Sequence, residues 1–336
     1  MVYNVTELIE SQVLTSLNTL FFHHTHTADS NRFEREVRDL NINAHATDYV
    51  EIMRRLPDGV DGIFTKTDHW KTNPEYFFQL EKRLQRNDID FERFDTHLVF
   101  RIDGSTGVII NGVEASFESE KEHFTIIGLP ISDNNLYYNL TLKELVEAGT
   151  KADWLSFAHM GMPFHRISEE TLRDVIYKAE QKDVDVAIGY ATGYSPLYNR
   201  ITRNEIPFRT PVQEYAREYN LPVVPELDLH CVVPPGFTGC GVTDSEATRV
   251  LTEGKLPTQK LLAADLFIPS QYREGISVVE LLRTYAVFLP GIPQRGNSEQ
   301  TFRHSLPQRR QLQSINIRSS VQTLSTDTQN KVSTTR

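Results

Sequence analysis

Cysteine and long hydrophobic runs are the two features that this sequence has least of. Cys231 and Cys240 are the only cysteines in 336 residues, which is too few for a disulfide framework. We interpret both as reduced thiols; a ligand role stays open for Cys231, which directly follows His230. No apolar run approaches the roughly 18 residues that span a bilayer, and the first residues, MVYNVTELIESQ, lack the order of a signal peptide. The sequence therefore predicts a cytoplasmic protein without a membrane segment.

The charge is unevenly distributed along the chain. The net charge is −10, yet the segment from Ala286 to Arg336 carries seven Lys or Arg against two Asp or Glu. This end is rich in Gln, Ser, Thr and Arg, and it has too few large apolar residues to offset the entropy of folding. We expect a folded domain over residues 1–290 and a disordered, mildly basic tail over 291–336. The acidic body argues against a broad nucleic-acid-binding face and suits divalent cations.

Short apolar runs alternate with amphipathic stretches, which is typical of strands and helices that succeed one another around a parallel sheet. The expected strands cover 17–22, 60–66, 106–116, 123–129, 152–158, 184–190 and 221–227. The expected helices cover 47–55, 73–86, 141–148, 168–182 and 211–219. Ser168, followed by two glutamates, is typical of a helix start. The predicted fold class is α/β, with loops such as 87–105 and 190–210 shaping a pocket.

Side chains that can bind metals lie at the ends of most of these strands. The first strand is followed by His24-Thr25-His26 and the second by Thr67-Asp68-His69. The other positions of this kind are Glu114, His123, His159, Asp228 and His230. The carboxyl ends of parallel strands meet at one edge of a barrel, so we expect these groups to converge. Without cations, buried carboxylates would repel one another there and buried imidazoles would lack partners.

A mixed set of imidazoles and carboxylates suits Zn, Fe or Mn, and a carboxylate such as Glu114 can bridge two ions. His24 and His26 are two residues apart on an extended segment, so both can reach one ion. Each of these residues alone is more commonly an ordinary hydrogen-bonded side chain. Their joint order on separate strand ends is what predicts a metal centre.

The order and the letters of these motifs resemble the PHP family, named from polymerase and histidinol phosphatase. The matching stretches are HTHTADS at 24–30, TDH at 67–69, NGVEAS at 111–116, His123, AHM at 158–160 and LDLH at 227–230. The resemblance covers residues 17–265. It implies a distorted (β/α)7 TIM-like barrel that holds up to three divalent metal ions (Zn, Mn or Fe) at the C-terminal ends of its strands. The implied ligands are His24, His26, Asp68, His69, Glu114, His123, His159, Asp228 and His230.

The activity that the resemblance implies is hydrolysis of phosphoester bonds by a metal-activated water. The substrate would be a phosphorylated small molecule, a nucleotide or an oligonucleotide. His159 and His230 are the candidates for the general acid, and Arg166 and Lys66 are the candidates for a phosphate clamp. Two alternatives stay open, a metal-dependent amidohydrolase and a non-catalytic PHP module that serves as a structural or partner-binding domain. The oligomeric state is not predicted.

Several residues beside the implied ligands depart from the family pattern. Where the family commonly has Asp, Pro, Ser and Ala, this chain has Phe22, Met160, Leu227 and Leu229. Gly189 stands where the family frequently has Glu, which leaves the substrate contacts open. His23 stands where the family usually has an apolar residue, so we interpret it as a neighbour of the ligands. The surroundings of the metal ligands are therefore expected to differ from the family pattern.

Overall fold

The structure is a computed structural model. It describes residues 19–30, 47–56, 59–118, 122–160, 167–191, 212–229, 240–242 and 267–269. The chain divides into two units, residues 1–290 and 291–336, and every described residue lies in the first unit. The tail expected at 291–336 lies outside the described residues, and so do Arg166 and His230.

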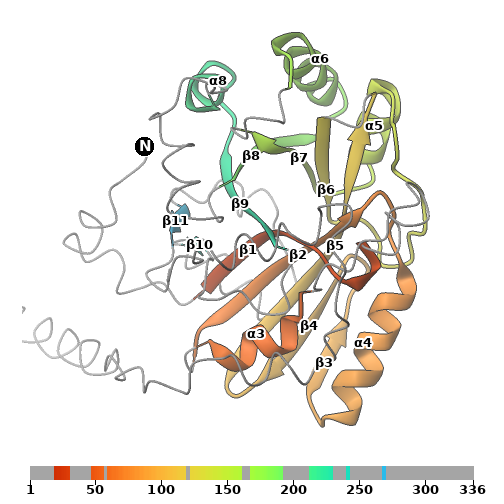
Figure 1. The fold of residues 1–336 in the computed structure, drawn as a ribbon, viewed down its shortest axis with the longest axis vertical. Coiled ribbons are helices and arrows are strands. Elements are labelled where there is room, and N and C mark those ends of the chain that lie inside the picture. Colours follow the sequence, from red (N-terminus) through yellow and green to blue (C-terminus); the bar gives the residue numbers. More distant parts are fainter. Residues whose placement is uncertain are drawn as a thin grey trace, which may run out of the picture. The chain divides into compact units, whose positions relative to one another are not determined.

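Eleven strands form one strongly curved sheet (Figure 1). In chain order they are β1 (Thr19–Thr25), β2 (Asp61–His69), β3 (Asp90–Arg93), β4 (His97–Ile102), β5 (Ser105–Phe117), β6 (Glu122–Ile127), β7 (Trp154–Met160), β8 (Asp185–Ala191), β9 (Val223–Leu229), β10 (Cys240–Val242) and β11 (Phe267–Pro269). Five helices accompany them in the described part of the chain: α3 (Tyr49–Arg55), α4 (Pro74–Arg86), α5 (Leu142–Gly149), α6 (Glu169–Glu180) and α8 (Val212–Glu218). The seven expected strands and five expected helices all have counterparts among these elements.

Seven strands pair in a closed circuit, in the order β1, β2, β5, β6, β7, β8, β9 and back to β1. The α/β class with a barrel-like sheet is therefore confirmed. The expectation of a wholly parallel barrel is wrong for β6, which pairs antiparallel with both β5 and β7. Because β6 runs backwards, its first residues lie beside the last residues of β5, and His123 pairs with Ser116. The reversal brings an N-terminal strand end to the edge where the other strands of the circuit have their C-terminal ends.

The sheet is also richer in strands than expected before β5. Residues 87–105, expected to be a loop, contain β3 and β4, which pair antiparallel with each other, and β4 also pairs antiparallel with β5. The outer strand β3 has the sequence DFER and is largely exposed, so its residues lack the apolar alternation that predicts a strand. Its charged residues are typical of an edge strand that avoids further pairing.

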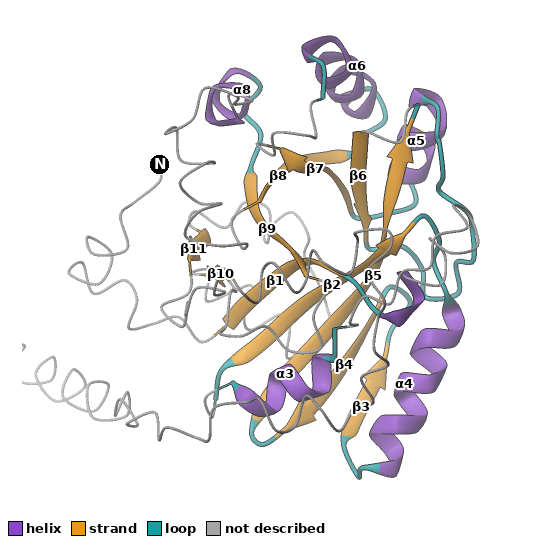
Figure 2. Ribbon diagram, in the orientation of Figure 1, coloured by secondary structure: helices purple, strands orange, loops and turns teal. Residues whose placement is uncertain are grey.

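Helices cover the outside of the curved sheet in two groups (Figure 2). Phe77 and Leu84 of α4 pack with Phe64 and Phe100 of the strands, while Leu145 of α5 packs with strand residues of the other half of the sheet.

The helices α3 to α6 begin at residues whose side chains cap the first backbone amides. The expected cap at Ser168 is confirmed, since its hydroxyl accepts from the Thr171 amide. Thr141 and Glu144 form a reciprocal capping box at α5.

The inside of the strand circuit is filled by one apolar layer to which all seven strands contribute. Its members on these strands are Phe21, Ile63, Val108, Ile110, Ile127, Trp154, Ala187 and Val224, and Val99 of β4 belongs to the same cluster. Side chains two residues further along each strand face the same way, so the next layer toward the C-terminal ends of β1, β2 and β7 is built from His23, Thr65 and Ser156. The apolar layer is thus a dry floor beneath a polar layer.

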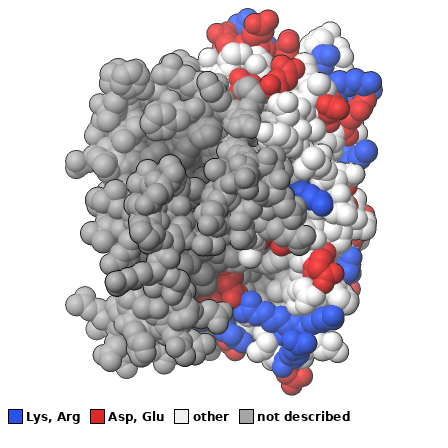
Figure 3. Space-filling view, turned by 45° about the vertical axis from the view of Figure 1, so that its right-hand side comes forward, with Lys and Arg blue, Asp and Glu red and all other residues white. Residues whose placement is uncertain are grey.

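Charged side chains of both signs lie on the described face in Figure 3, where Lys and Arg gather toward the lower edge. No helix of the described residues is long and apolar enough to cross a membrane. The carboxylates of Glu114 and Glu226, by contrast, are fully buried.

Candidate metal centre

Two strands of the circuit carry an irregularity near the ends that face the polar layer. The pairing register shifts between Phe22 and Thr25 in β1 and between Phe157 and Met160 in β7. His24 and His159, at these shifts, have φ angles of 64° and 56°. A left-handed conformation at a non-glycine residue costs about 1–3 kcal/mol and is typical of functional sites. Each shift is a bulge, which changes which face of the sheet the following side chains occupy.

The bulge in β1 explains how three histidines in four positions all turn inward. Phe21 lies in the floor and Phe22 packs outside, as strand alternation requires. His23 faces inward and contacts Ser156, and His24 also faces inward because it occupies the bulge. His26 then shares the inner face with both. Met160 packs outside after the β7 bulge, while His159 turns inward.

His23 belongs to a buried polar layer between the floor and the other histidines. Its Nδ1 lies 3.1 Å from the Thr65 hydroxyl and its Nε2 lies 3.2 Å from the Ser156 hydroxyl. Burial lowers the pKa of His23 to about 4, and this outweighs the opposing effect of Glu226. A neutral imidazole bonded to two hydroxyls fits the interpretation of His23 as a neighbour of the ligands.

Glu114 lies at the centre of the cluster, and each of its carboxylate oxygens faces its own set of imidazoles. Oε2 lies 3.1 Å from His24 Nε2, 3.3 Å from His26 Nε2 and 2.9 Å from His69 Nε2. Oε1 lies 2.5 Å from His123 Nδ1 and 2.9 Å from His159 Nε2. We call the first three histidines the Oε2 side and the last two the Oε1 side. A carboxylate with ligand sets on both oxygens has the arrangement of a bridge between two cations.

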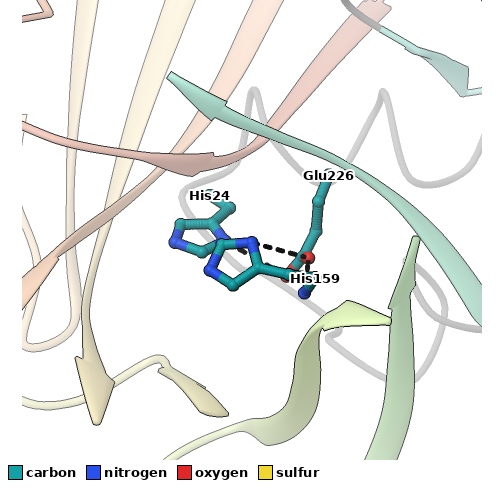
Figure 4. Close-up of side chains that lie close together, drawn as sticks. All are labelled: His24, His159 and Glu226. Atoms are coloured by element: carbon teal, nitrogen blue, oxygen red, sulfur yellow. Dashed lines mark hydrogen bonds and ion pairs between the residues drawn. The ribbon is translucent and has the colours of Figure 1, made fainter. Parts of the chain in front are cut away.

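Three groups of these side chains place their ligand atoms close enough to hold an ion. They are His24 with His26 and Glu114, Glu114 with His123 and His159, and His24 with His159 and Glu226 (Figure 4). The set of donors is imidazole nitrogen and carboxylate oxygen, which suits Zn, Fe or Mn. The buried His and Glu groups could therefore hold a metal ion. Solvent comes closest at His69 and His123, which are 8% and 9% exposed.

The electrostatics of the cluster favour a cation. Burial alone would raise the pKa of Glu114, but His69, His24, His123 and His159 hold it well below its usual range. Burial alone would lower the pKa of His24, but Glu114 and Glu226 raise it well above its usual value. Burial alone would also raise the pKa of Glu226, but His24, His159 and His23 lower it below its usual value. Both carboxylates are thus ionised in a buried site, where uncompensated charge is costly. Positive charge is needed here, from protons on the imidazoles or from metal ions.

Asp68 has a different place from the other expected ligands. Its Oδ1 accepts from the Thr27 amide at 2.5 Å, and its Oδ2 accepts from the Thr27 hydroxyl at 2.7 Å and lies 2.6 Å from Lys66 Nζ. Lys66 is fully buried, 5.1 Å from the centre of the Tyr76 ring. Neither Asp68 nor His69 is in the three groups found among the described residues, but His69 Nε2 lies 2.9 Å from Glu114 Oε2. Asp68 therefore fixes the turn after β1, and Lys66 neutralises it.

Six of the nine expected ligands lie together around or at Glu114. His24, His26, His69, Glu114, His123 and His159 come together in the cluster. Asp228 lies in β9, but its side chain is not among those that the structure describes, and His230 and Arg166 lie outside the described residues. These three remain predictions.

Sequence reasoning missed one member of the site, Glu226, and placed Ser30 only in the HTHTADS motif without a contact of its own. Glu226 lies within the apolar run of 221–227, fully buried, two residues after the floor residue Val224. An acid inside an apolar strand, on its inner face, is a sign that could have found it. Ser30 accepts from the His69 amide and contacts Nδ1 of both His26 and His69.

No protein-family model matches this chain, and no curated protein matches it either.

Proposed function

We propose that this protein is a metal-dependent hydrolase of phosphoester bonds, similar to the PHP family in its metal ligands. The observation that carries the proposal is the carboxylate of Glu114, whose two oxygens face separate sets of imidazoles at 2.5–3.3 Å. Ligand sets of this kind hold paired cations in enzymes that cleave phosphoesters. The order of motifs along the sequence supports the same function.

The residues present fit two divalent cations. His24, His26 and His69 with Glu114 Oε2 would hold one, and His123 and His159 with Glu114 Oε1 would hold the other. When bound, the cations would activate a water and neutralise charge on the phosphate. Asp228 and His230 are the candidates for completing a further position.

The chain itself prepares this site in three ways. The apolar floor, which includes Phe21 and Val224, excludes water from one side of the site. The low polarity there strengthens electrostatic interactions in the site. The bulges turn His24 and His159 inward. The partly exposed edges of His69 and His123 mark the side from which a substrate would enter. Because Lys66 is buried beside Asp68, we assign the phosphate-binding role to Arg166 alone.

The test is metal analysis combined with a substrate panel. Purified protein, stripped with a chelator and reloaded with Mn, Fe or Zn, would be assayed on an aryl phosphate, a phosphodiester, a short oligonucleotide and an amide. We expect release from at least one phosphoester, and loss of that release in Glu114→Gln. The matched control is His97→Gln, since His97 is also buried but stacks on Phe94 outside the cluster.

Each result of this panel decides between functions. Turnover of the amide alone would favour an amidohydrolase. Bound metal without turnover of any substrate would favour a non-catalytic module. Protein that takes up none of the three metals would contradict the metal centre itself.

A further inference from the structure

His24 and His159 form a stacked pair of imidazoles between two carboxylates. Their ring centres lie 4.6 Å apart. The Nε2 atoms of both rings face Glu114, at 3.1 Å and 2.9 Å. On the other side, His24 Nδ1 lies 3.2 Å from Glu226 Oε1 and His159 Nδ1 lies 3.9 Å from Glu226 Oε2. Figure 4 shows Glu226 with these two histidines. Each ring thus presents one nitrogen to the proposed cations and the other to Glu226.

His26 and His69 form a second stacked pair, with ring centres 4.4 Å apart, and it is arranged in the same way. Their Nε2 atoms face Glu114 Oε2. Their Nδ1 atoms lie 2.9 Å and 2.7 Å from the hydroxyl oxygen of Ser30. One polar group behind each pair therefore contacts the nitrogens that point away from Glu114. The two groups differ in that Ser30 serves only the Oε2 side, whereas Glu226 contacts one histidine from each side.

Gly189 makes the position of Glu226 possible. A Cβ atom at Gly189 would lie 2.2 Å from the carboxyl carbon of Glu226 and 2.2 Å from its Oε1. The carboxylate has little freedom to move away, because Oε2 also accepts from the His159 amide at 2.5 Å and Oε1 contacts His24. The neighbouring strand β8 must therefore carry glycine at this position.

We propose that Glu226 is a positioning residue that orients His24 and His159 together, and so couples the two metal positions on either side of Glu114. An imidazole that binds a cation through Nε2 carries its proton on Nδ1, and a carboxylate that accepts this proton fixes the tautomer and the ring orientation. For His159, Glu226 acts mainly through the backbone amide at the bulge. The proposal rests on the metal centre proposed above and does not depend on the reaction.

The first test is metal binding by Glu226→Gln, measured as equivalents at saturation and as dissociation constants by chelator competition. We expect the wild-type number of equivalents, with affinity at both positions weakened about 10–100-fold, as is usual when a group behind a metal ligand is lost. The cobalt-loaded variant should also show an altered visible spectrum, because both histidines change orientation. Loss of one equivalent at saturation would instead make Glu226 a direct ligand and overturn the positioning role.

The second test uses Gly189→Ala. This variant keeps Glu226, but the added methyl group occupies the position of the Glu226 carboxylate and displaces it. We expect weaker metal binding in the same direction. The double variant of Gly189→Ala and Glu226→Gln should bind no more weakly than Glu226→Gln alone, because the glycine acts through the carboxylate. The control is Gly62→Ala, a buried strand glycine whose added methyl would meet Met53 instead; it should leave metal affinity unchanged.

These outcomes separate the inference from the proposed hydrolysis. A protein that binds metal as described but releases no phosphate would end the proposal for the reaction and support this one. Additive losses in the double variant, wild-type affinity in Glu226→Gln, or a wild-type protein that binds no metal would each overturn the positioning role. Circular dichroism of the metal-free variants identifies any that fail to fold. If Glu226→Gln fails to fold, the metal affinity of Gly189→Ala decides whether Glu226 has the positioning role.

Discussion

The two sides of Glu114 are built differently, although they share one carboxylate. The Oε2 side takes its three imidazoles from two adjacent parallel strands: His24 lies in β1, His26 directly follows β1, and His69 is the last residue of β2. The Oε1 side takes two imidazoles from β6 and β7, which are antiparallel. Counted by their contacts with Glu114, the first side therefore offers four ligand atoms and the second offers three. Of these residues only His69 is in none of the groups whose ligand atoms lie close enough together to hold an ion.

The number of ligands on each side sets how strongly each side should bind a cation. Four protein ligands make a closed site, as in structural zinc centres, whereas three leave a coordination position for water or substrate. We expect a cation on the Oε2 side to be held tightly and to exchange slowly. A cation on the Oε1 side should exchange more easily and should be the one that meets the substrate.

The largest effect is expected from Glu114→Gln, which removes the group common to both sides. Bound metal should fall from about two equivalents to less than one, because the neutral amide offers one weak oxygen in place of two charged ones. Elemental analysis after gel filtration measures this. The control His97→Gln should retain the wild-type metal content. Two equivalents in Glu114→Gln would mean that the carboxylate bridges nothing.

Much of this site could be predicted because its residues follow simple rules. Apolar runs mark the strands, and polar residues at their ends converge when the strands are parallel. His26, His69 and Glu114 are found in this way. Strand alternation also separates Asp68 from His69, since adjacent residues face opposite sides of a sheet. Asp68 pairs with Lys66, two residues earlier on the same strand, and that pairing could have been expected.

Other parts could not be predicted because long-range packing decides them. Neither bulge has a glycine or asparagine at its left-handed position; histidines occupy both. Without the bulges, alternation would place His24 and His159 on the outer face. The reversed direction of β6 depends on its pairing with β5 and β7. The role of Gly189 depends on the pairing of β8 with β9, because the Glu226 carboxylate occupies the space that a Cβ atom at position 189 would need.

Removing one imidazole from each side gives the next largest effect and the sharpest contrast. His123→Ala leaves the Oε1 side with two ligand atoms, so one metal equivalent should be lost at micromolar metal. His26→Ala leaves the Oε2 side with three, so both equivalents should remain at saturation with weaker affinity. Titration with a chelator as competitor distinguishes the two variants. Loss of an equivalent in His26→Ala, with both kept in His123→Ala, would contradict the expected difference between the two sides.

A smaller effect is expected from Ser30→Ala, which leaves every ligand in place. The Nδ1 atoms of His26 and His69 lose their common contact, so the affinity of the Oε2 side should fall about 10-fold. The Oε1 side should be unaffected, in contrast to Glu226→Gln. Ser105→Ala is the matched control, because its buried hydroxyl accepts from the Gly59 amide far from the cluster along β5. Equal weakening of both sides by Ser30→Ala would contradict a side-specific role.

The smallest effect on metal binding is expected from Thr65→Val, which concerns the bulge beneath the Oε2 side. The Thr65 hydroxyl accepts from the His24 amide at 2.7 Å, and valine keeps the shape but leaves this buried amide without that acceptor. We expect the free energy of unfolding to fall by about 1–3 kcal/mol, measured by urea denaturation of the metal-free protein.

Metal affinity should change only a few-fold in Thr65→Val, since His26 and His69 remain in place on the same side. Thr67→Val is the control on the same strand; its hydroxyl donates to a carbonyl at 3.3 Å and accepts from no amide in the described contacts, so its loss of stability should be smaller. If both variants are equally stable, the bulge does not depend on Thr65. In that case the pairing of β1 with β9 must turn His24 inward. The strand β9, which carries Glu226, would then stabilise both bulges.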